Sequence, residues 1–346
     1  MYALLRPFLF ALDPHLAHRL GTAALGPLEH VALLRAPVRA FTSPSPSLRR
    51  TVMGLTFASP VGLAGGFDKN ADRARALAAL GFGFLELGTV TAHAQDENPR
   101  PNLFRLPRDR ALVNRLGFPN RGAKAVVEQF QRRGGATATG VPVGFSIGKS
   151  RIVDVGEDPA PIVADYIESF RAVHPASDFV VVNVSSPNTK NLRALQGAAL
   201  ARVLFGALAE ENRRLGKKPL LVKIAPDLDD AALDDLHAVV DEVKLDGVVA
   251  TNTTLSRTGL ATATPELERV GAGGLSGPPL RERAISFVRR TRKALPNVAI
   301  IGVGGIETGA HARAFLDAGA DLVQLYTGFV YRGPFTARSI ARELVQ

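Results

Sequence analysis

Eight short apolar runs recur along this chain, and each is followed by a segment with the periodicity of an amphipathic helix. The runs span residues 61–64, 84–90, 143–147, 179–184, 220–224, 247–252, 298–303 and 322–326, and the helical segments include 71–80, 200–215, 230–243, 285–295 and 311–318. The runs are too short for buried helices and suit strands buried on both faces of a parallel sheet. Eight alternating strand–helix units predict an α/β fold, a closed (β/α)8 TIM barrel.

The barrel accounts for most of the chain. The 346 residues are 46% apolar, which is enough for one large core without division of the barrel into two domains. We expect the barrel domain to cover residues 43–346, with a linker at 41–47 and hairpins at 50–57 and 103–115.

Residues 1–42 predict a short N-terminal helical extension ahead of the barrel. Two leucine-rich helices are expected there, the second begun by Asp13 as N-cap and Pro14 at the first helical position. Such a segment can cover the barrel or anchor it at a membrane interface. The pattern of residues leaves both open.

The composition excludes several classes of function. Because the chain contains no cysteine, it forms neither disulfides nor cysteine-ligated iron–sulfur clusters and cannot use a thiolate in catalysis. The net charge of +10 favours anionic partners, but the arginines are scattered, so we expect no nucleic-acid binding. We also expect no metal site. No apolar run reaches the roughly 18–20 residues of a membrane span, and the N-terminus lacks the basic region of a signal peptide.

The predicted strands all end in polar residues or glycines. In a barrel of this type the carboxyl ends of the strands form the active-site mouth. The residues expected there are Lys69, Thr89, Ser146, Asn183 with Ser186, Lys223, Thr251 with Asn252, Gly304 with Gly305, and Tyr326 with Thr327 and Gly328. In residues 183–188 two carboxamides flank a hydroxyl, a set that can recognise a flat ring of donors and acceptors and leave one atom to move a proton. Two lysines and several carboxamides at one mouth predict a binding site.

Glycine-rich turns follow the seventh and eighth predicted strands, and a third glycine cluster spans residues 273–277. Any one of these glycines is as well explained by an ordinary tight turn. Three clusters facing one mouth favour a phosphate site, in which backbone N–H groups and a helix N-terminus bind the anion.

Several motifs resemble those of one enzyme family. They are AGGFDK at 64–69, ELGTVT at 86–91, NPRP at 98–101, NRLGF at 114–118, NVSSPNT at 183–189, KIAPD at 223–227, ATNTT at 250–254, GGLSG at 273–277 and IGVGGI at 301–306. Together they resemble dihydroorotate dehydrogenase, and the similarity extends from Asp13 to the C-terminus. Ser186, where another branch of the family has cysteine, and the N-terminal extension are similar to the quinone-dependent, membrane-associated class 2 enzymes.

This resemblance implies oxidation of (S)-dihydroorotate to orotate in de novo pyrimidine (UMP) biosynthesis, with FMN as bound hydride acceptor and a membrane quinone as final electron acceptor. The FMN contacts that it implies are Ala64, Gly65, Gly66, Phe67, Asp68, Lys69, Thr89, Ser146, Asn183, Lys223, Thr251, Gly277, Gly305, Tyr326 and Thr327. The implied substrate contacts are Lys69, Asn114, Arg115, Leu116, Gly117, Phe118, Asn183, Asn188, Asn252 and Thr253.

The resemblance also implies individual roles. Ser186 would remove the C5 proton of the substrate, with Phe118 shielding it and Thr189 relaying its proton. Lys69 can neutralise the substrate carboxylate, and Lys223 beside the flavin ring favours the negative charge that develops as the ring is reduced.

A quinone acceptor requires an apolar path from the bilayer to the flavin. The leucines of residues 1–42 can line such a path, and nearby arginines attract anionic lipid headgroups. By the resemblance, His18 and Arg105 would lie at the inner end of this path, and the protein would associate peripherally with the cytoplasmic side of the cell membrane.

Two positions depart from the family pattern. Ser146 stands where the family usually has asparagine, and Pro119 follows Phe118 where asparagine is common.

Two alternative functions fit the sequence less well. A tRNA dihydrouridine synthase is another FMN barrel, but resemblance to that family would imply a cysteine that this chain lacks. A non-catalytic barrel that binds a phosphorylated ligand or docks on an acidic membrane would leave Ser186 and the paired carboxamides unexplained.

Overall fold

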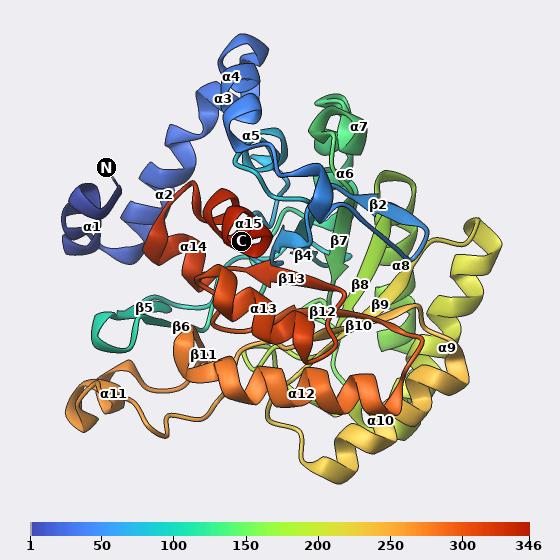
Figure 1. Ribbon diagram of the computed structural model, residues 1–346. Helices are drawn as coiled ribbons and strands as arrows, with labels where there is room; N and C mark the ends of the chain where they lie inside the picture. The colour runs from blue at the N-terminus through green and yellow to red at the C-terminus, as the bar shows by residue number, and fades with distance from the viewer. Residues whose placement is uncertain (1) are drawn as a thin grey trace.

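A closed ring of eight parallel strands forms the centre of the molecule, with helices around it (Figure 1). The computed structural model describes residues 2–346, so the first residue of the predicted extension lies outside the described part. In order around the ring the strands are β3 (Val61–Leu63), β4 (Leu85–Val90), β7 (Val143–Ile147), β8 (Phe179–Asn183), β9 (Leu220–Ile224), β10 (Gly247–Ala250), β12 (Ala299–Val303) and β13 (Leu322–Leu325), which pairs with β3. Every predicted apolar run contains one of these strands, and the (β/α)8 prediction is confirmed.

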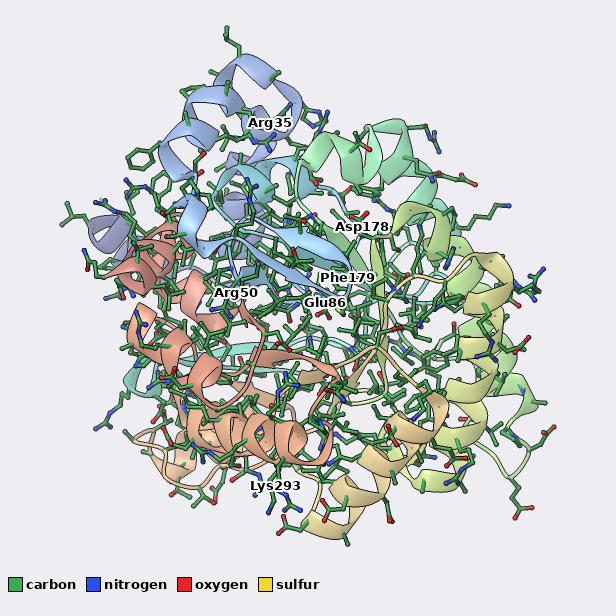
Figure 2. The ribbon with its side chains drawn as sticks, turned by 45° about the vertical axis from the view of Figure 1, so that its right-hand side comes forward. Arg35, Arg50, Glu86, Asp178, Phe179 and Lys293 are labelled. Atoms are coloured by element: carbon green, nitrogen blue, oxygen red, sulfur yellow. The ribbon has the colours of Figure 1, made fainter. Side chains whose placement is uncertain are left out.

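Aromatic rings fill the amino-terminal end of the barrel. Phe57, Phe84 and Phe179 are fully buried and meet edge to face, with ring centroids 5.3 and 6.3 Å apart for the two pairs that share Phe84. Figure 2 shows Phe179 in the interior of the molecule. Gly62 and Gly144 make room for the rings, because a Cβ atom there would lie 2.4 Å from Phe84 and 2.1 Å from Phe179. Burying each phenylalanine contributes roughly 1.5–3 kcal/mol to stability.

The predicted hairpin β1 (Arg50–Val52) and β2 (Leu55–Phe57) is confirmed, and its apolar side chains cover this end of the barrel. With the amino-terminal end closed by packing, access to the barrel is from the carboxyl ends of the strands, where loops are long.

Eleven further α-helices follow the extension in the described chain, and the longer ones each bury one apolar face. They are α5 (Ala74–Ala79), α6 (Ala123–Arg132), α7 (Gly135–Thr139), α8 (Ala160–Val173), α9 (Ala198–Leu215), α10 (Asp230–Val243), α11 (Thr264–Val270), α12 (Arg281–Ala294), α13 (Gly309–Asp317), α14 (Thr327–Arg332) and α15 (Thr336–Val345). Apart from α11, these helices and the outer faces of the strands contribute to one continuous core. Val270 and Leu267 of α11 instead pack with a small sheet at the barrel mouth.

Within residues 2–42 the N-terminal extension contains four helices, so the prediction of two was wrong. They are α1 (Tyr2–Ala11), α2 (Pro14–Ala24), α3 (Gly26–His30) and α4 (Ala32–Thr42). Asp13 caps α2 as predicted, accepting hydrogen bonds from the N–H groups of His15 and Leu16. The second predicted helix is divided because Pro27 has no N–H group and is accommodated only in the first turn of a new helix.

The linker predicted at residues 41–47 was also partly wrong, since α4 continues to Thr42 and a 3-10 turn spans Pro46–Leu48. The Thr42 hydroxyl is buried and donates to the carbonyl of Ala79 at 2.7 Å, which fixes the end of α4 against α5. In Figure 1 the extension lies along one side of the barrel, with α1 next to α14 and α3 next to α5.

A small antiparallel sheet stands over the barrel mouth. Its hairpin, β5 (Leu103–Leu106) and β6 (Ala111–Asn114), was predicted. The third strand, β11 (Gly274–Ser276), was not; it pairs with β6 in the register Leu275 to Val113. This pairing positions the third glycine cluster at the mouth.

Candidate active site

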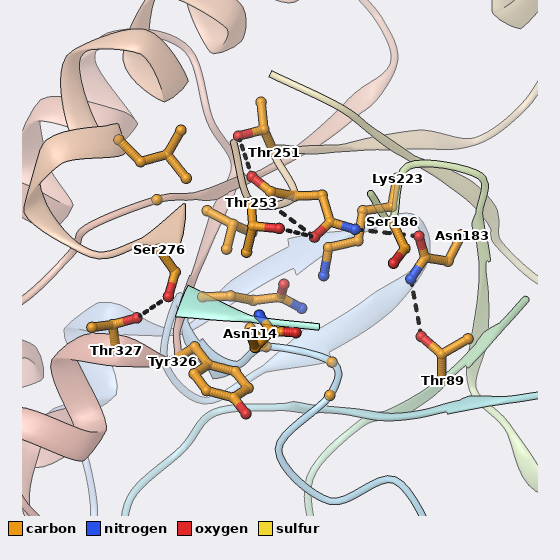
Figure 3. Close-up of a pocket in the computed structure, with 18 of the residues that line it drawn as sticks. Thr89, Asn114, Asn183, Ser186, Lys223, Thr251, Thr253, Ser276, Tyr326 and Thr327 are labelled. Atoms are coloured by element: carbon orange, nitrogen blue, oxygen red, sulfur yellow. Dashed lines mark hydrogen bonds between the residues drawn. The ribbon is translucent and has the colours of Figure 1, made fainter. Parts of the chain in front are cut away.

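The loops at the carboxyl ends of the strands enclose a cavity of about 940 Å³, its open mouth included. This is within the size range of small-molecule and cofactor sites. The predicted residues on its wall are Ala64, Gly65, Gly66, Lys69, Thr89, Asn114, Leu116, Gly117, Phe118, Asn183, Ser186, Asn188, Lys223, Thr251, Asn252, Thr253, Gly277, Gly305, Tyr326 and Thr327. Figure 3 shows Lys223, Ser186 and Asn183 on one side of the cavity and Tyr326, Thr327 and Ser276 on another.

Four of the predicted FMN and substrate contacts do not line this cavity. Ser146 is fully buried behind the wall and reaches it only through Thr89, whose hydroxyl lies 2.9 Å from its own. Arg115 points away and donates to the carbonyls of Val270 and Ala272. Asp68 accepts two backbone N–H groups at the turn that leads into α5, and Phe67 faces a second cavity.

Glycines on the wall bring backbone close to any ligand. Gly277 and Gly305 have φ values of +111° and +66°, which side chains rarely adopt. A Cβ atom would lie 2.8 Å from the Arg110 carbonyl oxygen at Gly277, and 2.6 Å from the Gly277 carbonyl oxygen at Gly305. Nearby, the Thr327 hydroxyl donates to Ser276 at 2.8 Å. Backbone amides and hydroxyls in such a turn are suited to a phosphate.

The carboxamides on the wall are held in place by a layer of hydrogen bonds beneath them. Asn183 donates to the Thr89 hydroxyl at 3.0 Å and accepts from the buried Ser185 hydroxyl at 3.0 Å. Asn252 donates to the same Ser185 oxygen at 2.9 Å. Asn188 donates to the Asn114 side chain at 3.1 Å. These bonds fix the planes of the amides before any ligand arrives.

Ser186 follows strand β8 and lies on the cavity wall with 5% of its surface exposed. Its oxygen accepts the backbone N–H of Asn188 at 3.2 Å, a contact that stabilises negative charge on that oxygen. Within residues 2–346, the buried hydroxyl oxygen of Thr189 has no hydrogen-bond partner, so it is available to a water or to a neighbour that moves. The Ser186 hydroxyl, which is a weak base, thus has one contact that stabilises its deprotonated oxygen, and the Thr189 hydroxyl lies three residues further along the chain.

Lys69 lines the cavity and brings a positive charge to its wall. Desolvation lowers its pKa to about 8, against the opposing effect of Asp68 and Glu97. Its ammonium donates to the Gly66 carbonyl at 2.7 Å and keeps two further N–H groups for an anionic ligand.

Sequence reasoning missed two polar residues inside the barrel. The Glu86 carboxylate lies 3.2 Å from the Lys223 ammonium and accepts the Gln324 amide N–H at 2.8 Å. Gln324 lines the cavity, and its buried Oε1 has no partner among the described residues. The available signal was a carboxylate or a carboxamide within each of two mainly apolar strands, Leu85–Val90 and Leu322–Leu325.

A second cavity, of about 1450 Å³ with its opening, lies between the extension and the barrel. It is lined mainly by apolar side chains, and Tyr326 borders both cavities. The Phe67 ring packs edge to face on Tyr326, with ring centroids 5.7 Å apart, and on His18, with ring centroids 5.6 Å apart. A continuous series of ring contacts therefore extends from His18 in the second cavity to Tyr326 at the first.

The two residues predicted for a quinone site, His18 and Arg105, both line this second cavity. Arg105 donates to the carbonyls of Phe10 and Leu12, which fixes the turn between α1 and α2. Although the His18 ring faces open space, desolvation by the surrounding apolar walls, together with the charges of Lys69 and His15, lowers its pKa to about 4. The imidazole is therefore neutral near pH 7 and has one donor and one acceptor. Among residues 2–346, no helix is both long and apolar enough to cross a bilayer.

Fold and cavity together define a (β/α)8 barrel enzyme with its chemistry at the carboxyl ends of the strands. The family model of dihydroorotate dehydrogenase matches residues 47–346. Curated relatives named dihydroorotate dehydrogenase (quinone) include one from Rhodococcus opacus, 48% identical over 100% of this chain and 94% of the relative, and one from Pseudarthrobacter chlorophenolicus, 46% identical over 97% and 95%.

A crystal structure of DHODH in complex with ferulenol from Eimeria tenella superimposes with a TM-score of 0.84 at 34% identity, covering 96% of this chain and 90% of that one. The chain belongs to the dihydroorotate dehydrogenase family, whose members are flavoprotein oxidoreductases. The family predicted from the motifs is confirmed.

Proposed function

We propose that this protein oxidises (S)-dihydroorotate to orotate in pyrimidine biosynthesis, with FMN as the bound hydride acceptor and a membrane quinone as the final electron acceptor. The observation that carries the proposal is the pair of adjacent cavities, one polar with Ser186 on its wall and one apolar, both bordered by Tyr326. A substrate and an apolar electron acceptor can therefore approach the same cofactor from different directions.

The residues on the first cavity suit FMN. The glycine turns at Gly277 and Gly305 suit its phosphate, and the Gln324 oxygen, which has no partner within residues 2–346, suits a ring N–H group. Lys223 offers an ammonium to the ring. When bound, FMN would supply the acceptor for the hydride from C6 of the substrate and the electrons for reduction of the quinone. The remaining holding residues are Ala64, Gly65, Gly66, Lys69, Thr89, Asn183, Thr251, Tyr326 and Thr327.

The chain's own residues bind and deprotonate the substrate. Lys69 pairs with the carboxylate, and the amides of Asn114, Asn183 and Asn252 bind the polar edges of the ring. Ser186 Oγ takes the C5 proton while hydride leaves C6, so the electrons of the C5–H bond form the C5–C6 double bond. The proton then leaves through Thr189 or a water, and Phe118 keeps bulk water from the base.

Residues 1–42 act as the membrane and quinone-access extension, and residues 43–346 as the FMN-binding barrel. The apolar second cavity receives the quinone, whose carbonyl binds His18 or Arg105. Leu4, Leu5 and Phe8 are exposed on α1 and enter the surface of the cytoplasmic leaflet, so the protein is held peripherally at the cell membrane.

Anaerobic addition of dihydroorotate to the purified holoenzyme tests this function. We expect the flavin absorbance to bleach and then to return when quinone is added. Denaturation of the protein should release FMN. Two results would contradict the proposal. One is a well-folded protein without flavin, and the other is bound FMN that stays oxidised after dihydroorotate is added.

A further inference from the structure

A fully buried carboxylate lies inside the barrel next to the proposed flavin site. Glu86, on β4, has no exposed surface, and Figure 2 shows it in the interior of the molecule. Its Oε1 lies 3.2 Å from the Lys223 ammonium and its Oε2 accepts the Gln324 amide N–H at 2.8 Å. One carboxylate thus links β4 to β9 on one side and to β13 on the other.

The packing around Glu86 leaves the carboxylate little freedom. A Cβ atom on Gly65 would lie 2.3 Å from Glu86 Oε1, so the glycine at this position makes room for the carboxylate. Within residues 2–346, Lys223 is its one ion-pair partner. A buried charge held this closely is costly unless it is paired, so the position of Glu86 depends on Lys223 and the position of Lys223 depends on Glu86.

Both partners of Glu86 reach the cavity, whereas Glu86 itself does not line it. Because Glu86 accepts the amide N–H of Gln324, the Gln324 carbonyl oxygen is left for a ligand, and that buried oxygen has no partner in the described chain. Lys223 presents its ammonium to the same cavity. The charge that a ligand meets there is therefore the sum of a lysine and the carboxylate behind it.

We propose that Glu86 is a positioning residue for the redox step, fixing Lys223 and Gln324 beside the flavin ring and setting the flavin's reduction potential through its negative charge. The inference rests on the proposed function, since it requires a flavin in the cavity. Lys223 alone would stabilise the reduced, negatively charged ring. Glu86 offsets that charge, so the reduced flavin stays a good donor to the quinone.

The test is the midpoint potential of the bound flavin, measured by equilibration with a reference dye. In Glu86→Gln the lysine charge is no longer offset, and we expect the equilibrium to shift at least tenfold toward reduced flavin, about 30 mV more positive for a two-electron couple. Glu86→Met removes the same charge with a side chain of similar length and less need for polar partners, and we expect the same shift from it.

Two comparisons separate electrostatic positioning from a merely structural role. Lys223→Met should shift the equilibrium the other way, and Glu86→Met/Lys223→Met, which removes both charges, should return it toward wild type. Glu29→Gln alters another buried, ion-paired carboxylate, in α3, and should leave the potential unchanged.

A redox equilibrium constant within twofold of wild type in flavin-loaded Glu86→Gln or Glu86→Met would overturn the inference and leave the proposed function intact. Absence of flavin from the wild-type protein would overturn both.

Discussion

At the scale of single residues, Ser186 carries the sharpest prediction. Ser186→Ala removes the proposed base, so flavin reduction by dihydroorotate should slow by roughly 10²–10⁴-fold. Flavin content should remain normal, because the fold does not depend on this hydroxyl. Anaerobic stopped-flow absorbance measures the rate, and Ser286→Ala, on the outer helix α12, is the matched control. Near wild-type reduction by Ser186→Ala would instead assign the base to Thr189 or a bound water.

The lowered pKa of Lys69 predicts that substrate binding depends on pH. Desolvation lowers its pKa to about 8, so the ammonium is present below that pH and lost above it. The dihydroorotate carboxylate keeps its partner only below pH 8, and KM should rise toward tenfold per pH unit above it. Lys69→Met should bind weakly at every pH between 6.5 and 9.5. A wild-type KM that stays flat up to pH 9.5 would exclude this role.

At the scale of elements, the barrel strands were predictable and several other features were not. Each strand is a local apolar run bounded by turn residues, so its signal is complete within a few residues. Strand β11 has no such signal; Gly274 to Ser276 become a strand only because β6, about 160 residues earlier, is there to pair. The division of the second helix at Pro27 was readable, since proline prefers a first turn.

The residues of the candidate site likewise divide into those that the sequence predicts and those that it does not. Residues on strand ends, such as Lys69 and Lys223, follow from topology alone once a barrel is inferred. Whether a neighbour reaches the cavity depends on side-chain direction, and so Ser146 and Arg115 were expected on a wall from which they are absent. The Glu86 to Lys223 pair joins residues 137 apart in sequence and has no local pattern.

The contact between α3 and α5 gives a prediction about stability. Glu29 is 1% exposed, lies 3.0 Å from the Arg75 guanidinium and accepts the Ala76 backbone N–H at 3.0 Å. Glu29→Gln weakens both contacts, and we expect the free energy of unfolding to fall by about 1–3 kcal/mol.

Urea unfolding measures this change. The matched control is Glu242→Gln, which breaks a solvent-exposed pair with Arg202 and should change stability by at most about 1 kcal/mol. Equal effects in the two variants would show that the extension is not fixed to the barrel through Glu29.

At the scale of the whole molecule, the extension has two parts with different environments. Helices α3 and α4 pack on the barrel through Glu29, Val38 and Thr42. Helices α1 and α2 enclose the apolar cavity and leave Leu4, Leu5 and Phe8 exposed. Deleting residues 1–42 would therefore remove buried contacts as well as the exposed surface. Substitution of the exposed side chains isolates their contribution.

Leu4→Ser/Leu5→Ser/Phe8→Ser should abolish membrane binding without affecting the oxidation of dihydroorotate. The variant loses most of the exposed apolar surface of α1, so it should no longer sediment with vesicles that contain anionic lipid. Reduction of a long-chain quinone in those vesicles should fall at least tenfold, while a short-chain, water-soluble quinone and the bleaching of flavin by dihydroorotate should be unaffected, because the second cavity is intact. Val203→Ser, an exposed apolar residue on the distant helix α9, controls for general loss of surface apolarity. A triple variant that still binds vesicles and reduces the long-chain quinone at the full rate would mean that the extension covers the barrel without anchoring it.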